Sequence, residues 1–185
     1  MKNLNKEAIN NGIIISVISI AIGLLIYYVA TSMLGSIWFG ITTGVIILAI
    51  YVFLTIDLRK KIGGFWTFKE ALKGIFLMSL VANVISSLFN FIFYKYIETG
   101  AYDKVVGVVT ESTTATYEKM GMGQSDIDKA TEKVLENLKS TYQPEFLDLL
   151  KTLGIAILIG FVLSLIFAAI FKKNPPMFAP IEEAE

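Results

Sequence analysis

The side chains best suited to chemistry form a polar stripe along one apolar segment. Serines and asparagines recur there at three- and four-residue steps, which places them on one face of a helix. The members of this polar stripe are Ser79, Asn83, Ser86, Ser87 and Asn90. Such a face indicates either a hydrophilic pathway or small polar-ligand site, or hydrogen bonds to neighbouring helices. We favour the hydrogen bonds, because an amide surrounded by hydrocarbon must find a polar partner.

The residues that most enzymes and metal sites use are missing. The chain contains no histidine and no cysteine, so it lacks the commonest general base and the usual ligands of zinc, haem and iron–sulfur clusters. We therefore expect no catalytic residue, no metal and no cofactor, and a protein that is not an enzyme. We also expect no nucleic-acid partner, because the main basic cluster is short and lies between apolar segments.

Four apolar segments predict membrane-spanning helices. Hydrophobic residues make up 55% of the chain, and about 20 apolar residues cross a bilayer core of roughly 30 Å. The uncharged stretch 8–56 is too long for one span, so we expect a turn at residues 31–36, where small polar residues interrupt it. The predicted spans are 12–30, 37–56, 74–95 and 152–171. We interpret the first as an uncleaved helix, since its apolar run exceeds the roughly 7–15 residues of a signal sequence.

Basic residues gather beside these spans on one side of the predicted membrane. Apart from the N-terminus, they are Arg59, Lys60, Lys61, Lys69, Lys73, Lys172 and Lys173. Membrane proteins keep such residues in cytoplasmic loops, so both termini are predicted to be cytoplasmic. The same side chains are expected to contact lipid headgroups. The tail, residues 174–185, is predicted to be disordered.

The ends of the spans carry further signals. Thr67 and Glu70 fit a capping box, so the third helix should begin near Thr67 and continue past Gly74 without a kink. Aromatic side chains are enriched at membrane interfaces, and two groups fit that pattern. We expect an outer belt of Tyr27, Tyr28 and Trp38, and an inner one of Phe65 and Trp66.

Residues 97–150 differ from the rest, because acidic residues outnumber basic ones there. Apolar residues at helical spacing predict two amphipathic helices, separated by a stop at residues 121–123 and with Ser125 as the N-cap of the second. This helical hairpin is predicted to be an extracytoplasmic insert between the third and fourth spans. Because it is too small to bury a core alone, its apolar faces should meet each other, the membrane surface or a partner.

Small residues predict close helix packing. The second span carries a GxxxG pattern, and the fourth has a small residue at every fourth position. These positions are Gly40, Gly44, Ala156, Gly160, Ser164 and Ala168. They fit either packing within the chain or self-association, and we favour packing within a four-helix bundle.

Three passages resemble one known family. They are the basic loop RKKIGGFWTFKEALKGIF, the insert segment MGMGQSDIDKATEKV and the last span LGIAILIGFVLSLIFAAIFKKNPP. Together they identify the chain as similar to the bacterial membrane family catalogued as domain of unknown function 4199. The resemblance implies a small inner-membrane protein of four spans. It carries no established activity, so it transfers no functional residue.

Two functional hypotheses follow from these patterns. The preferred one is a non-enzymatic, all-α integral membrane protein that acts through protein–protein contacts of its extracytoplasmic insert, with a protein partner or a second copy of itself. The alternative is a small channel, transporter or lipid-handling subunit that uses the polar stripe. In both, the other partners are membrane lipids.

Overall fold

The computed structural model describes residues 4–174, and within that range the chain is all-helical. The long helices are α1 (Leu4–Val29), α2 (Ile37–Lys61), α3 (Phe68–Ile92), α4 (Ala101–Lys119), α5 (Gln124–Tyr142) and α6 (Phe146–Phe171). A 3₁₀ turn, η1 (Thr31–Met33), precedes α2, and a π-helical segment, η2 (Phe93–Ile97), continues α3. Four helices, α1, α2, α3 with η2, and α6, are long and apolar enough to cross a membrane. This confirms the predicted all-helical class and four helices suited to span a membrane. Apart from residue 174, the predicted disordered tail lies outside the described residues.

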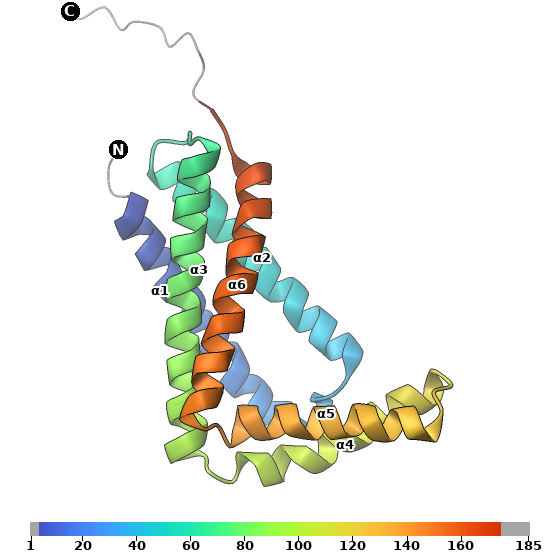
Figure 1. The fold of residues 1–185 in the computed structure, drawn as a ribbon. Helices are drawn as coiled ribbons and strands as arrows, with labels where there is room; N and C mark the ends of the chain where they lie inside the picture. The colour runs from blue at the N-terminus through green and yellow to red at the C-terminus, as the bar shows by residue number, and fades with distance from the viewer. Residues whose placement is uncertain (1–3, 175–185) are drawn as a thin grey trace, which may run out of the picture.

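Helix α3 is the centre of the bundle. It packs along α1 on one side and along α6 on the other, as Figure 1 shows. The core residues come from all four spans and include Ala8, Ile15, Leu58, Ala71, Ile75, Met78, Phe167 and Ala168. Helix α2 differs, because its buried residues are confined to Leu54, Thr55 and Leu58 near its C-terminal end. Its N-terminal half slants away from α6 in Figure 1.

Helices α1 and α3 approach each other closely at Gly12. A Cβ atom added there would lie 2.7 Å from the backbone oxygen of Met78 and 2.8 Å from Cβ of Val81. Distances under about 3 Å between such atoms are sterically forbidden, so only glycine allows this approach. The α1–α3 contact therefore depends on a residue that the sequence pattern did not single out.

The start of α3 forms as predicted. The Glu70 amide donates to the Thr67 hydroxyl at 3.4 Å, and the Thr67 amide donates to the Glu70 carboxylate at 2.8 Å. These reciprocal bonds satisfy two amides that the first helical turn leaves unpaired. The helix then continues through Gly74 to Ile92. Both the capping box and the uninterrupted helix are confirmed.

Helices α4 and α5 pack on each other and lie across the ends of the spans, opposite the end where α1 begins (Figure 1). Their inward residues include Val105, Val109, Ile127 and Leu138. The prediction of Ser125 as the N-cap of α5 was wrong. The cap is Gly123, which has extended backbone angles (φ −68°, ψ 149°), so the helix already begins at Gln124.

The turn before α2 also contacts this helical pair. Gly35 has a φ of 86°, and a Cβ atom added to it would lie 3.0 Å from Cβ of Ser112 and 3.2 Å from Cα of Val109. The positive φ and the close neighbour both favour glycine. The turn that leads into α2 is thus packed closely against α4.

Two of the expected belt residues are core residues instead. Tyr27 and Trp66 are each 1% exposed, whereas Trp38 is 80% exposed. The Tyr27 hydroxyl and the Trp66 indole N–H each donate a hydrogen bond within the protein, and such bonds favour burial of an amphipathic ring. The other three expected belt residues are exposed: Tyr28, Trp38 and Phe65.

Candidate functional site

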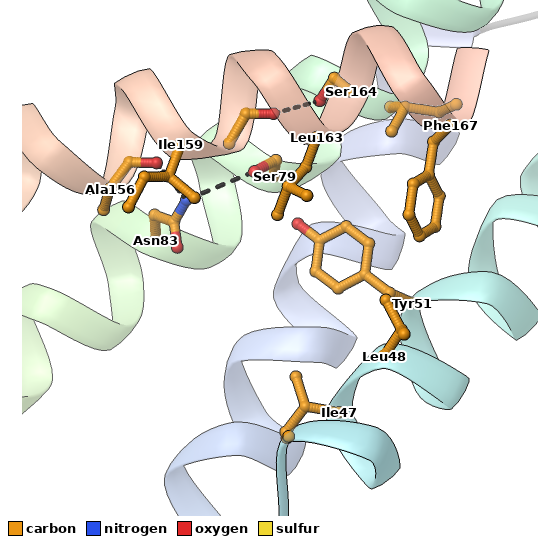
Figure 2. Close-up of a pocket in the computed structure, with 13 residues that line it drawn as sticks. Ile47, Leu48, Tyr51, Ser79, Asn83, Ala156, Ile159, Leu163, Ser164 and Phe167 are labelled. Carbon is orange, nitrogen blue, oxygen red and sulfur yellow. Dashed lines mark hydrogen bonds between the residues drawn. The ribbon is translucent and has the colours of Figure 1, made fainter. Parts of the chain in front are cut away.

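A groove of about 430 Å³ lies between α2, α3 and α6. Its volume is in the range of about 300–1,000 Å³ that is typical of ligand pockets. The groove exists because α2 diverges from the other two helices. Its walls are mainly apolar, and Figure 2 shows them. The apolar and aromatic lining includes Ile47, Leu48, Tyr51, Ile75, Ala156, Ile159, Leu163 and Phe167.

Three polar side chains converge in this groove. The Asn83 amide nitrogen donates to the Ser79 hydroxyl at 3.3 Å and to the Ala156 carbonyl at 3.4 Å. Both of its amide hydrogens are thus engaged, and its carbonyl oxygen remains an acceptor. The Tyr51 hydroxyl points toward Ser79 (Figure 2). A fourth polar residue, Ser164, donates to the Gly160 carbonyl of its own helix at 2.6 Å.

Gly160 brings α3 and α6 together at the groove. A Cβ atom added there would lie 2.5 Å from Oγ of Ser79 and 3.3 Å from Nδ2 of Asn83. Ala156, Gly160 and Ser164 line the groove, while Ala168 is fully buried in the core. The small residues of α6 therefore face inward, which fits the role in packing expected for them.

The GxxxG pattern of α2 is placed differently. A Cβ atom added to Gly40 or Gly44 would have no neighbour within 4 Å. The expected packing within the chain is thus not formed at these two glycines, because the residues of α2 that pack on the core of the bundle begin at Ile50. Gly44 lines the groove, and Gly40, one turn earlier, does not.

The structure divides the predicted polar stripe. Ser79 and Asn83 line the groove. Ser87 and Asn90 line a separate cavity of about 100 Å³ beside Ser140 and Thr141 of α5. Ser86 lines neither cavity. The stripe is therefore not one continuous pathway, and only its first two residues belong to the candidate site.

The basic residues lie at the end of the bundle where α1 begins and α6 ends. Two of them, Arg59 and Lys173, also form hydrogen bonds within the protein. Arg59 donates to the Phe171 carbonyl at 3.2 Å, and the Trp66 indole donates to the same oxygen at 2.8 Å. The backbones of Trp66 and Lys173 exchange hydrogen bonds at 2.9 and 3.0 Å. Five of the predicted headgroup-contacting lysines are exposed at this end: Lys60, Lys61, Lys69, Lys73 and Lys172.

Sequence reasoning missed a polar network around one buried asparagine at the same end. Asn11 is fully buried, and its amide donates to the Leu54 carbonyl at 3.0 Å and to Asp57 at 3.1 Å. Lys61 pairs with Asp57 at 2.8 Å and with Glu7 at 3.7 Å. An asparagine at the edge of an apolar run was the available signal, because such an amide needs a partner.

A second missed cluster ties the opposite end of the bundle to α4. The Glu98 carboxylate accepts hydrogen bonds from Tyr27 at 3.0 Å and from Tyr28 at 3.2 Å. The Lys104 ammonium lies 4.3 Å from the centre of the Tyr27 ring. Tyr142 of α5 stacks near the same ring at 6.5 Å, and burial raises the pKa of its hydroxyl. This cluster holds the helical pair against the spans.

The groove thus offers neutral hydrogen-bonding groups and no ionisable side chain other than Tyr51. Among residues 4–174, no three metal-ligating side chains come together. A family model described as "Protein of unknown function (DUF4199)" matches residues 10–173. Comparison with curated proteins and with solved structures gives no match.

Proposed function

Because the chain belongs to the DUF4199 family, whose description names no activity, we propose a function from its geometry: it is a non-enzymatic membrane protein that binds a lipid between α2, α3 and α6. The observation that carries this proposal is the groove of about 430 Å³, in which neutral polar groups interrupt an apolar wall. The location proposed is the bacterial inner membrane. The basic residues at one end of the bundle support cytoplasmic termini and an extracytoplasmic α4–α5 pair.

The surroundings of the groove support a lipid as its occupant. All three helices that form it are long and apolar enough to cross a membrane. The groove would therefore be surrounded by lipid acyl chains and not by water. The N-terminal half of α2 has no buried residue, which leaves the groove open to the side. An unfilled apolar groove would forfeit the dispersion contacts of its lining.

Filling the groove should displace its occupant. Gly44→Leu adds a side chain to the groove wall without a clash, because a Cβ atom there meets nothing within 4 Å. We expect labelling of the groove by a diazirine-bearing hexadecane to fall about tenfold, since extra methylenes in an occupied space cost about 1–3 kcal/mol. Mass spectrometry of the labelled protein in nanodiscs would locate and quantify the adducts.

Gly40→Leu is the matched control, because it makes the same change one turn earlier on α2, outside the groove. It should leave labelling unchanged. A second copy of the chain is the competing occupant. The natural chain has no cysteine, so Gly44→Cys introduces a single thiol. Efficient disulfide-linked dimers in membranes, with no hexadecane adducts in the groove, would show that a second copy fills it and that the lipid proposal is wrong.

A second candidate function is a protein–protein contact through α4 and α5. It is supported by the exposure of their acidic residues, while their apolar faces are turned inward. The exposed acids are Asp103, Glu111, Glu118, Asp126, Asp128, Glu132 and Glu136. Charge complementarity would select a basic partner surface.

This contact predicts a charge-dependent complex. Cross-linking in membranes should give a defined adduct that Glu132→Lys with Glu136→Lys abolishes, because reversed charges repel a basic partner. Lys129→Ala with Lys133→Ala, on the same helix, should retain the adduct. Monomer alone in every sample would contradict the proposal.

A further inference from the structure

We infer that the occupant of the groove is a neutral lipid without a charged headgroup, whose polar oxygen group lies inside the hydrocarbon core against Tyr51, Ser79 and Asn83. This inference rests on the proposed lipid binding and specifies the chemical class of the lipid. Three features of the groove carry it: its charge, the depth of its polar groups, and the hydrogen-bonding capacity that they leave free.

The charge of the lining excludes an ionic group. No lysine, arginine, aspartate or glutamate lines the groove. A phosphate or carboxylate placed there would be a buried charge without a counter-ion, which is among the most unfavourable arrangements in a membrane. The hydroxyls of Tyr51 and Ser79 and the amide of Asn83 are neutral groups instead. They complement a carbonyl, an ether or an alcohol.

The depth of the polar groups excludes an ordinary bilayer phospholipid. From Lys73, the last basic residue before the apolar part of α3, the helix rises roughly 9 Å to Ser79 and roughly 15 Å to Asn83, at about 1.5 Å per residue. From Tyr51 to Asp57, the first charged residue towards the basic end of α2, the rise is roughly 9 Å. The polar groups therefore lie well inside a hydrocarbon core of roughly 30 Å. A phospholipid keeps its headgroup and ester groups at the interface, so only its apolar chains reach this depth.

The free hydrogen-bonding capacity matches a single oxygen group. Both amide hydrogens of Asn83 are engaged with Ser79 and Ala156, so its carbonyl oxygen is available to accept from an alcohol. The Tyr51 hydroxyl, which points into the same region (Figure 2), is available to donate to a carbonyl or an ether. Long-chain alcohols, ketones and quinone-type lipids share this chemistry: an apolar body with an uncharged oxygen group that tolerates the membrane interior.

The test compares three photoactivatable probes with the same diazirine-bearing chain: hexadecanol, hexadecane and a phosphatidylcholine. With the protein in nanodiscs, we expect the alcohol to label the groove more strongly than the other two. Tyr51→Phe should weaken alcohol labelling about threefold to tenfold, because a hydrogen bond within a membrane contributes at that level. It should leave hexadecane labelling unchanged.

Tyr51→Phe is expected to fold, since it keeps the ring that meets Phe167 edge-on at 6.3 Å. Tyr96→Phe makes the same change at a tyrosine that is 68% exposed and should have no effect. Asn83→Leu, checked for folding by thermal unfolding, is a second variant and should also reduce alcohol labelling.

Equal labelling by hexadecanol and hexadecane, or no effect of Tyr51→Phe, would overturn the assignment of a polar neutral lipid while leaving lipid binding intact. Equal labelling by the phosphatidylcholine would show that ordinary acyl chains fill the groove and would overturn the exclusion of a bilayer phospholipid. Failure of all three probes to label the groove would instead overturn the proposed function itself.

Discussion

Gly12→Leu should prevent the native packing of α1 against α3. The added Cβ would lie 2.7 Å from the Met78 carbonyl oxygen and 2.8 Å from Val81 Cβ. Neither atom can move away by rotating a side chain, so the two helices would have to separate along the contact that builds the core. We expect a loss of about 3 kcal/mol or more, at the upper end of the cost of overpacking. Thermal unfolding of the detergent-solubilised protein would measure it.

Gly23→Leu is the control for this prediction. It makes the same change on the same helix, at a position where an added Cβ has no neighbour within 4 Å. A substitution at such a position should change stability by less than about 0.5 kcal/mol. Equal thermal stability of the Gly12 and Gly23 variants would show that α1 and α3 are not in close contact.

Trp66→Ala should be the second strongly destabilising change. Trp66 is 1% exposed, and its indole donates to the Phe171 carbonyl at 2.8 Å. Truncating a buried tryptophan costs about 3–5 kcal/mol, and here it also removes a hydrogen bond at the C-terminal end of α6. The natural comparison is Trp38→Ala, because Trp38 is 80% exposed.

We expect Trp66→Ala to lower the unfolding temperature strongly and Trp38→Ala to leave it nearly unchanged. Trp66→Phe separates the two contributions. It keeps most of the buried ring but loses the N–H, so it should cost about 1 kcal/mol, the usual net value of one hydrogen bond. A Trp66→Ala protein as stable as the natural one would contradict the burial of this residue.

Elements whose signal is local could be predicted from the sequence. Spans follow from long apolar runs, and the capping box needs only Thr67 and Glu70, three residues apart. Close helix contacts are not local. Gly12 is critical because Met78 and Val81 lie opposite it, whereas the more conspicuous Gly40 and Gly44 have no neighbour. The spacing of glycines on one helix does not reveal which face meets another helix.

The candidate site shows the same division. The spacing of Ser79 and Asn83 indicated that they share a face of a helix, and both line the groove. Tyr51 could not be added to them from the sequence, because its position depends on the tilt of α2. Ser87 and Asn90 have the correct spacing but face a different cavity beside α5. A periodic pattern identifies a face, and the neighbouring helices decide what that face contacts.

The close contact of Gly35 with α4 couples the position of α4 to the position of α2. Helix α2 is held at two places. Near its C-terminal end, Leu54 and Leu58 pack in the core, and before its N-terminal end, the turn at Gly35 contacts Val109 and Ser112. The stretch between these two contacts forms one side of the groove. A displacement of α4 relative to the spans would therefore move the start of α2 through the contact at Gly35, and the width of the groove would change with it.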